Sequence, residues 1–508
     1  MNKETYQPTP ETLHILQQAA QFFNTRSRQT YLVGGSVRDV LLHVPCIDWD
    51  IVTNDDAPRL ARQLANMLGG HYAHMNDKAS RVTIKQNQQE IILDISPLHD
   101  ATIEEDLRAR DFTINAMALP LSEAIDSLLA GTPLPLIDPL HGNDDLAAHC
   151  LRTVDDATFQ QDPLRMLRAV RFMQHYQFTI EPHTAMLLTR DASLLTQVAP
   201  ERIHQELCAI LEPPGGTTRL RFLDSHGLLT TLIPEFIPAR GMPQPELHHW
   251  DVLEHSLETV GYLEHLATLL QQPVAQIERS PLELNDQGDL VAIQALLREA
   301  EEQHIFAFAK LTSASMKLAA LLHDIGKTVT YTLSAEGDIR FYGHPQAGIP
   351  LVQHILHRLS GSLQERRLAQ QVAGNHMRPG QLSRDQVTPR AIRRYFVDLG
   401  PTGISVALIS LADHLAMRGP DPLTLSWERH LATVRLLLNT YIRERERIIP
   451  PRLIQPDELM RRLNLTPGPI IGQLLEAIAE AQTEGKLHSK DEALWLAEEI
   501  LQSQEHAS

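Results

Sequence analysis

Two aspartates one residue apart, Asp48 and Asp50, are the residues of this 508-residue chain whose type and spacing first indicate chemistry. They lie in DWDIVT, a short run typical of a β-strand. Side chains two positions apart on a strand point to the same face, about 7 Å from each other, so Trp49 and Ile51 take the opposite face. Convergent carboxylates can hold Mg²⁺. An isolated pair is also typical of a solvated edge strand, so the neighbouring residues decide its interpretation.

A Gly-Gly turn precedes this strand, in YLVGGSVRD. Gly34 and Gly35 allow backbone N–H groups to approach a phosphate closely. Ser36 adds a hydroxyl, and Arg38 adds a guanidinium suited to phosphate oxygens. Asp94, in the strand-like EIILDIS, is either a third metal ligand from a neighbouring strand or a polar strand end. A phosphate cradle beside paired carboxylates predicts metal-dependent phosphoryl or nucleotidyl transfer.

A second set of candidate ligands lies in the middle of the chain, in LEHSLETV, LLHDIGK, GHPQAG, GNHMRP and ADHLAMR. Imidazole and carboxylate together suit Mn, Fe, Ni, Co or Zn better than Mg. A lone histidine is usually a capping or surface residue. An adjacent His-Asp followed by Gly-Lys inside an apolar helix, with His and Asp on both sides, instead predicts a metal site.

The elements that must position these residues differ along the chain. Short β-rich runs separated by helical stretches occupy residues 31 to about 120, which predicts an α/β block. After LPLIDPLHGNDDL the pattern becomes helical and stays helical. Pro and Gly clusters mark expected joints near 212–216, 233–246, 419–422 and 450–456.

The composition is that of a globular chain with two to four domains, since 508 residues are too many for one core and 43% of them are apolar. No apolar run approaches the roughly 20 residues that a membrane span needs, and the first residues lack the pattern of a secretory signal. Cys46, Cys150 and Cys208 are odd in number and far apart. This favours a reducing cytoplasm over a disulfide framework or a cysteine zinc site.

The net charge of −18 is unusual for a nucleic-acid binder, because phosphate contacts need local Lys and Arg. Arginine is nevertheless dense at 165–171, 389–394, 442–452 and 461–462. Solvated helix faces are the usual meaning of the last three clusters.

GGSVRD followed by DWD resembles the signature of the polymerase-β-like nucleotidyltransferase superfamily. EEDLRARDFTINAMA, DPLHGNDDL, DPLRMLRAVRF and ERIHQEL resemble later motifs of class II tRNA nucleotidyltransferases, in family order over about residues 30–235. Those enzymes build or repair the CCA end of tRNA, and bacterial poly(A) polymerases are their close relatives. The resemblance implies that Asp48 and Asp50 hold catalytic Mg²⁺ while the Gly-Gly turn seats the triphosphate.

The resemblance also implies which residues contact the nucleotide. Arg110, Asp111 and Asn115 match family positions near the sugar and phosphates, with Asp111 accepting from a ribose hydroxyl. Asp162 and Arg165 match the segment that reads the base. There a carboxylate would accept from the exocyclic amine of cytosine or adenine, and a guanidinium would donate to the ring nitrogen, so that uracil and guanine are rejected.

The residues around this segment also allow a structural interpretation or differ from the family. Asp162 and Pro163 also fit an ordinary helix start, with Asp at the N-cap and Pro at N1. Gln161 stands where the family has an acidic residue, and its amide is a weaker acceptor than a carboxylate. Arg168 and Arg171 follow at i+3 spacing and are expected to line one face, toward tRNA or phosphate.

A short connection leaves the specificity open. Only nine residues separate Asp94 from Glu104. Many full CCA-adding relatives carry a longer loop there, and relatives that add only CC tend to have it shortened. A CC-adding enzyme that works with a separate A-adding enzyme is therefore an alternative. A poly(A) polymerase is another, although such enzymes often have a basic carboxyl tail.

The histidine-rich motifs resemble the HD phosphohydrolase superfamily. The positions that match the four ligands of that superfamily, and then the extra histidines of its two-metal members, are His255, His323, Asp324, Asp413, His344 and His376. Some tRNA nucleotidyltransferases carry an HD domain with phosphatase or 2′,3′-cyclic phosphodiesterase activity, so a second, hydrolytic activity stays open.

We therefore expect a polymerase-β-like α/β head followed by an all-α neck, body, HD domain and helical tail. The expected boundaries are 1–150, 151–240, 241–425 and 426–508. The expected function is addition or repair of the CCA end of tRNA with CTP and ATP, releasing pyrophosphate, in the cytoplasm and without a membrane. The rivals of another class are an HD metal phosphohydrolase with a noncatalytic RNA-binding head, and a noncatalytic RNA-binding scaffold. Nothing in the sequence indicates an oligomeric state.

Overall fold

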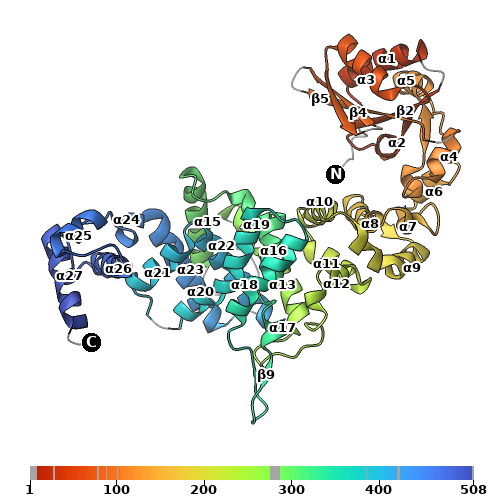
Figure 1. The fold of residues 1–508 in the computed structure, drawn as a ribbon. Helices are drawn as coiled ribbons and strands as arrows, with labels where there is room; N and C mark the ends of the chain where they lie inside the picture. The colour runs from red at the N-terminus through yellow and green to blue at the C-terminus, as the bar shows by residue number, and fades with distance from the viewer. Residues whose placement is uncertain are drawn as a thin grey trace. The chain divides into compact units, whose positions relative to one another are not determined.

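The structure is a computed structural model that describes residues 8–26, 29–76, 79–86, 89–99, 101–274, 287–384, 386–419 and 424–505. The chain forms two compact units (Figure 1). The first unit comprises Met1–Val198 with His226–Thr231, and the second comprises Ala199–Ser225 with Leu232–Ser508. The domain boundaries expected at 150, 240 and 425 stay predictions.

A six-stranded mixed sheet forms the centre of the first unit, in the order β3-β4-β5-β2-β1-β6. Its strands are β1 (Thr30–Val33), β2 (Asp48–Thr53), β3 (His71–Asn76), β4 (Ala79–Gln86), β5 (Gln89–Pro97) and β6 (Ala118–Pro120). The β2–β5 pair is parallel and the other pairs are antiparallel. The expected α/β head is therefore confirmed.

The helices of this unit are α1 (Pro10–Asn24), α2 (Gly35–Leu41), α3 (Ala57–Leu68), α4 (Ile103–Arg108), α5 (Leu121–Ala130), α6 (Gly142–Ala147), α7 (Thr158–Gln161), α8 (Arg165–His175) and α9 (Pro182–Asp191). Helix α3 packs on β3, β4 and β5, α5 packs on β1 and β6, and α1 packs against both helices (Figure 1). Helix α3 shows how capping residues fix the two ends of a helix. Asp56 caps its first turn by accepting from Arg59 N–H, and Gly69 ends it in the left-handed conformation at φ +65°.

The period of two along the strands separates an apolar face from a polar one. Trp49 and Ile51 are fully buried, whereas Asp48 and Asp50 lie on the other face. The predicted alternation is thus confirmed. The register places Asp50 opposite Asp94 on β5, and Asp94 opposite Arg81 on β4, so that three charged side chains form a row across the sheet.

The second unit is almost entirely helical. Its helices are α10 (Pro200–Leu211), α11 (Gly216–Ser225), α13 (Val252–Gln271), α15 (Gln287–Glu302), α16 (Ala314–Leu322), α17 (Lys327–Thr330), α18 (His344–Arg358), α19 (Leu363–Asn375), α20 (Met377–Leu382), α21 (Pro389–Leu399), α22 (Thr402–Met417), α23 (Leu425–Arg443), α24 (Arg445–Ile448), α25 (Pro456–Leu463), α26 (Pro469–Thr483) and α27 (Lys490–Glu505). A short hairpin of β9 (Thr332–Leu333) and β10 (Ile339–Arg340) interrupts them. The expected helical continuation is confirmed.

The last three helices share a small apolar core of their own, which includes Leu459, Leu474 and Ala493. The arginine cluster at 389–394 pairs with this tail instead of forming an open basic face. Arg390 and Arg394 each lie 2.6 Å from carboxylate oxygens of Glu480. The two arginines remain 46% and 55% exposed, so these ion pairs lie on a face that is still solvated.

Among the residues that the structure describes, no single helix is long and apolar enough to cross a membrane. One bent pair, α21 with α22, reaches the required length and composition only when both helices are taken together.

Candidate functional site

A cavity of about 600 Å³ lies on the polar face of the sheet. Of the nucleotide-site residues expected from the sequence, the cavity is lined by Gly34, Gly35, Arg38, Asp48, Asp50, Asp94, Arg110, Asp111, Asn115, Arg168 and Arg171. The structure thus brings together residues from β2, from β5, from α2 and the turn before it, from the segment after α4, and from α8.

The Gly-Gly turn forms one wall of this cavity, directly beside Asp50. Gly34 has a φ of +64°, and a Cβ there would lie 2.7 Å from Arg110 Nη1. A Cβ on Gly35 would lie 3.5 Å from Asp50 Oδ2. Because Gly34 and Gly35 carry no side chains, a ligand can approach both their backbone and the Asp50 carboxylate.

Ser36 is placed differently from the expectation. Its side chain is buried, and its hydroxyl donates to the carbonyl of Val33 over 2.9 Å. It does not line the cavity. Because α2 begins at Gly35, the Ser36 hydroxyl points back into the turn and holds the strand-to-helix connection instead of facing a phosphate.

The three carboxylates of the sheet carry an excess of negative charge. Arg81 binds Asp94 through two hydrogen bonds of 2.8 Å, and its Nη2 lies 3.9 Å from Asp48 Oδ2. Burial is the main cause that raises the pKa of Asp50 to about 6; Arg110 opposes it, and Asp94 and Asp48 add to it. Burial also raises the pKa of Asp48, against the opposing charge of Arg81. Carboxylates whose ionised form is disfavoured by their neighbours fit a bound divalent cation.

Arg38 is held by a network that fixes its guanidinium. It is buried, its Nε donates to Asp39 Oδ1 over 3.0 Å, and its terminal nitrogens donate to Asn115 and to the hydroxyl of Tyr176. Tyr176 donates in turn to Asp39 Oδ1 over 3.0 Å, and its ring lies 4.4 Å from the Arg38 guanidinium carbon. The predicted phosphate donor is therefore pre-oriented by a tyrosine that follows α8.

Asp111 lies in the cavity wall, but its oxygens already accept from protein groups. Oδ1 accepts from Phe112 N–H and Asn115 Nδ2, each at 2.9 Å. Oδ2 accepts from Arg168 Nε at 3.0 Å and from Arg168 Nη2 at 2.7 Å. Burial opposes ionisation, but Arg168 and these hydrogen bonds hold the pKa of Asp111 below its usual value. A carboxylate offers about four acceptor positions, so this one positions Arg168 and Asn115 and is not open to a ribose hydroxyl.

The expected base-reading pair lies outside the cavity lining. Asp162 Oδ1 accepts from Leu164 N–H at 3.1 Å in the turn between α7 and α8. Asp162 is not the N-cap that the sequence also allowed, because α8 begins at Arg165 and its N-cap is Leu164. The Arg165 guanidinium donates to the carbonyl of Ala109 at 3.0 Å and to Gln161 Oε1 at 3.1 Å. In this arrangement Arg165 holds the start of α8 against the loop after α4, and Asp162 accepts within the turn before α8.

Sequence reasoning missed several residues of this site. Asp39 follows Arg38 in the quoted motif, and its position was the signal that could have identified it. Arg81 and Tyr176 carry no local signal, because one meets Asp94 through strand register and the other meets Arg38 over a separation of 138 residues.

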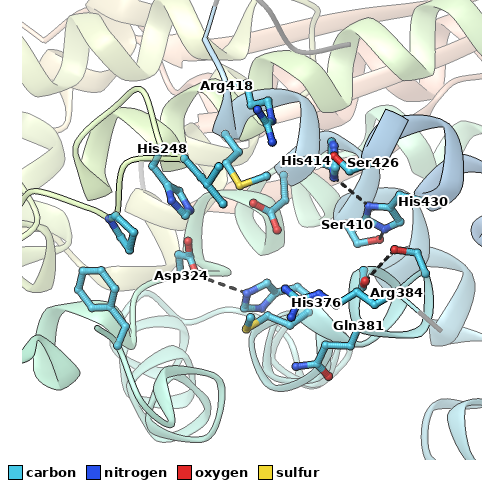
Figure 2. Close-up of a pocket in the computed structure, with 18 of the residues that line it drawn as sticks. His248, Asp324, His376, Gln381, Arg384, Ser410, His414, Arg418, Ser426 and His430 are labelled. Carbon is cyan, nitrogen blue, oxygen red and sulfur yellow. Dashed lines mark hydrogen bonds and ion pairs between the residues drawn. The ribbon is translucent and has the colours of Figure 1, made fainter. Parts of the chain in front are cut away.

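A second cluster borders a cavity of about 540 Å³ in the second unit, which Asp324, His344, His376 and Asp413 line (Figure 2). His255 and His323 are buried behind them. His255 on α13 places its Nε2 3.4 Å from Asp324 Oδ2 and 3.0 Å from Asp413 Oδ1. The Nε2 of His323 lies 3.3 Å and 3.6 Å from the same two oxygens. Its Nδ1 lies 2.7 Å from the carbonyl of Ala320, which leaves Nε2 as the nitrogen directed at the carboxylates.

The other oxygen of Asp324 faces two further histidines. The Nε2 atoms of His344 and His376 lie 3.3 Å and 3.4 Å from Asp324 Oδ1. Figure 2 marks the contact between His376 and Asp324. The Nδ1 atoms of these histidines lie 2.9 Å from the carbonyl of Phe341 and 3.0 Å from that of Ala373. Asp324 is therefore shared by two groups of ligands, as a residue between two metal ions would be.

The donor set fits a metal, and an observation of this structure supports the fit. Buried polar atoms without a hydrogen-bond partner include His255 Nε2, His323 Nε2, His344 Nε2 and Asp324 Oδ1. Buried polar groups are nearly always satisfied, so this concentration of unpartnered atoms marks a place for cations. All six ligands expected from the sequence meet here, from five helices or helix ends.

Lys327 and Gly326 complete the His-Asp turn. Lys327 Nζ lies 2.6 Å from Asp324 Oδ2 and donates to Gln244 Oε1 at 2.7 Å. Burial alone would raise the pKa of Asp324, but Lys327 and the neighbouring histidines hold it well below the usual value. A Cβ on Gly326 would lie 2.0 Å from the carbonyl oxygen of His344, so only glycine permits this approach of the turn to α18.

Three more histidines border the same cavity and were not expected as site residues. They are His248, His414 and His430. His414 and His430 face each other through their Nδ1 atoms at 3.2 Å (Figure 2). Burial, Lys327 and His255 lower the pKa of His248 to about 4, so it is neutral at pH 7.

Three family descriptions match successive parts of the chain. The Poly A polymerase head domain matches residues 30–152, the probable RNA and SrmB-binding site of polymerase A matches residues 177–240, and the HD domain matches residues 252–418. Nucleotidyltransferase head domains and HD domains generally use divalent metals. The first match contains the Gly-Gly turn and the three carboxylates of the sheet, and the third contains the six candidate HD ligands. Arg168 and Arg171 lie between the first two matches.

Full-length relatives are similar to this chain. The A-adding tRNA nucleotidyltransferase of Deinococcus radiodurans is 32% identical over 91% of this chain and 93% of its own length. The CC-adding tRNA nucleotidyltransferase of Thermus thermophilus is 29% identical over 92% of each chain. A solved CCA-adding enzyme in complex with ATP has a TM-score of 0.61 and 21% identity, covering 98% of this chain and 95% of that chain. That structural likeness is one of fold.

Proposed function

The chain belongs to the tRNA nucleotidyltransferase family, and from that premise we propose that it builds or repairs the CCA end of tRNA with CTP and ATP. The observation that supports this proposal is the strand register that gathers Asp48, Asp50 and Asp94 in one cavity beside the Gly34–Gly35 turn. A cytoplasmic location is part of the proposal, since tRNA is the substrate. The proposed reaction transfers a nucleotidyl group to an RNA 3′-hydroxyl and releases pyrophosphate.

The charges of the cavity favour a metal-bound triphosphate. Five carboxylates and four guanidinium groups line the cavity, so its own charge is not positive. Bound divalent cations would give it the net positive charge that attracts a triphosphate. Asp48 and Asp50 would hold Mg²⁺, with Asp94 as a third carboxylate steadied by Arg81. Bound Mg²⁺ would supply activation of the 3′-hydroxyl and stabilisation of the phosphate charge.

The protein residues would bind and orient the nucleotide. Backbone N–H groups at Gly34 and Gly35 would contact the triphosphate, and Arg38 would donate to it from the position fixed by Tyr176. Arg110, Arg168 and Arg171 line the same cavity and would add further donors. Asp111 and Asn115 would act by holding Arg168 and Arg38 in place.

Base selection by Asp162 and Arg165 requires a rearrangement. Arg165 would exchange its contacts with the Ala109 carbonyl and Gln161 for contacts with the base. Asp162 would accept from the exocyclic amine that cytosine and adenine share. An Arg165→Lys variant, which keeps the charge and loses the fork of donors, should therefore discriminate less between CTP and UTP.

One assay tests the proposed addition and its range. The purified protein is incubated with three tRNA transcripts: one that lacks CCA, one that ends in CC and one that is complete. Each transcript is tested separately with labelled CTP and with labelled ATP. A full CCA-adding enzyme extends the first with CTP and the second with ATP. An A-adding enzyme extends only the second, and a CC-adding enzyme extends only the first. Long untemplated A tracts would identify a poly(A) polymerase, and no incorporation would refute the proposal.

We also propose a phosphohydrolase activity for the HD cluster, because its unpartnered Nε2 atoms and shared Asp324 fit two transition-metal ions. His255, His323 and Asp413 with one oxygen of Asp324 would hold one ion, and His344 and His376 with the other oxygen would hold the second. Metals bound there would supply an activated water. Lys327 would hold Asp324 and present a positive charge to a phosphate.

Reciprocal variants separate the two activities. Asp48→Ala should abolish nucleotide addition and leave release of phosphate from a nucleotide or a 2′,3′-cyclic nucleotide, with Mn²⁺ or Ni²⁺, unchanged. His323→Ala should do the reverse. Loss of both activities in either variant would contradict two independent sites, and no hydrolysis in the unmodified chain would refute the HD activity alone.

A further inference from the structure

A third cluster of ligand-type side chains lies in the second unit, away from the HD ligands. His204 and Cys208 are four residues apart on α10 and therefore share one helix face. Glu365, in the first turn of α19, faces both. The His204 Nε2 atom lies 3.5 Å from Cys208 Sγ and 3.2 Å from Glu365 Oε2. One imidazole, one thiol and one carboxylate thus converge between two helices.

These separations are those of ligands around one tetrahedral ion. With Zn–S of about 2.3 Å and Zn–N and Zn–O of about 2.0–2.1 Å, tetrahedral ligands lie about 3.5 Å (N to S) and about 3.3 Å (N to O) from each other. The observed distances of 3.5 Å and 3.2 Å agree with both values. The combination of sulfur, nitrogen and oxygen donors selects Zn²⁺ or a similar borderline ion over Mg²⁺.

The HD cluster of the same chain gives an internal comparison. There the Nε2 atoms lie 3.0–3.6 Å from carboxylate oxygens that would share their metal. The His204–Glu365 separation falls within that range. All three ligand atoms of the third cluster also lie within 4.8 Å of one another, as they do in each group of HD ligands.

The surroundings of the thiol favour a cation once one is bound. Glu365 and Glu212 place negative charge near the Cys208 sulfur. The same carboxylates would stabilise a dication beside the sulfur. Glu365 Oε2 accepts one hydrogen bond, from Ser362 N–H at 2.7 Å, which leaves a lone pair for a metal.

We propose that His204, Cys208 and Glu365 form a zinc-binding site that joins α10 to α19. Binding replaces the thiol proton of Cys208 with the metal and releases that proton to solvent. Three protein ligands leave the fourth position to water. The site contributes no group to either proposed activity, so its existence does not depend on them.

Cobalt substitution tests this site with a signal that the HD cluster does not give. The full chain, stripped by a chelator and reloaded with Co²⁺, should show a thiolate-to-Co²⁺ charge-transfer absorption in the near ultraviolet. The HD ligands are nitrogen and oxygen atoms, so the band reports on sulfur alone. Cys208→Ala should lose the band and about one equivalent of Zn²⁺ per chain by elemental analysis. Cys150→Ala, the matched control in the first unit, and His323→Ala should keep the band.

Glu365→Gln keeps the proposal testable if Cys208→Ala does not fold. Glutamine can replace glutamate in the capping box that Glu365 forms with Ser362, so the start of α19 is preserved. This variant should bind Zn²⁺ at the thiol site at least about tenfold more weakly in competition with a chromophoric chelator. Absence of the charge-transfer band in the unmodified chain, its survival in Cys208→Ala, or unchanged affinity in Glu365→Gln would overturn the proposal.

Discussion

Replacing Asp50 by asparagine should stabilise the metal-free protein while it abolishes nucleotidyl transfer. The folded environment raises the pKa of Asp50 from 3.8 to about 6, with burial as the main cause. The difference is about two pKa units, and each unit corresponds to about 1.4 kcal/mol, so ionised Asp50 costs the fold up to about 3 kcal/mol at neutral pH. Asparagine has nearly the same shape and no charge, so the variant avoids this cost.

The pH dependence fixes the sign of the effect. Because the folded-state pKa lies above the unfolded value, the cost is fully present above about pH 6 and disappears as the pH falls toward 4. The stability difference between Asp50→Asn and the unmodified chain should therefore be largest above pH 6 and close to zero at pH 4. Nucleotide addition by the unmodified chain should decline as the pH falls through the pKa of Asp50, because the protonated acid cannot hold Mg²⁺.

Calorimetry of the metal-free chain measures the expected gain. For a unit of this size, about 3 kcal/mol corresponds to a rise of roughly 6–12 °C in the Tm of the head transition. Mg²⁺ with a nucleotide should then raise the Tm of the unmodified chain and leave that of the variant unchanged. Asp126→Asn, on the exposed side of α5, is the matched control and should change nothing. An unchanged or lower Tm for Asp50→Asn above pH 6 would refute the reasoning.

Two further variants probe the support of each site. Tyr176→Phe keeps the ring against Arg38 and removes one hydrogen bond to the Arg38 guanidinium, worth about 1.5 kcal/mol. The KM for CTP and the KM for ATP should therefore both rise by about tenfold. A changed preference between CTP and ATP would contradict a role confined to the triphosphate. Gly326→Ala places a methyl group within 2.0 Å of the His344 carbonyl oxygen, so elemental analysis should show loss of HD metal while nucleotide addition persists; full metal content would contradict the close packing of that turn.

The parts of the sites that the sequence predicts are those set by local periodicity or by contiguous motifs. The period of two on β2 places Asp48 and Asp50 on one face, whatever the rest of the sheet does. The His-Asp doublet lies at the end of α16, and the other HD ligands lie in short motifs at or near helix ends. Their meeting in one cluster follows from helix packing, and the metal-binding role of the six stays a prediction.

The parts that the sequence does not predict depend on register or on the direction of a side chain. Arg81 binds Asp94 because β4 pairs with β5 in one register, and a shift of one residue would turn it to the other face. Ser36 and Arg165 were expected to face a ligand, and each donates instead to a backbone carbonyl. The Val33 carbonyl meets Ser36 within the local turn, and the Ala109 carbonyl meets Arg165 across 56 residues of chain. Asp111 has its acceptor positions filled by groups that include Arg168, 57 residues away.

A crystal structure of the chain with Mg²⁺ and a non-reactive CTP or ATP analogue tests the central claim most directly. The account predicts a cation bound by both Asp48 and Asp50, with the triphosphate against the backbone of Gly34 and Gly35 and within reach of Arg38. A nucleotide bound elsewhere, or in that cavity with no cation on the two aspartates, would contradict it.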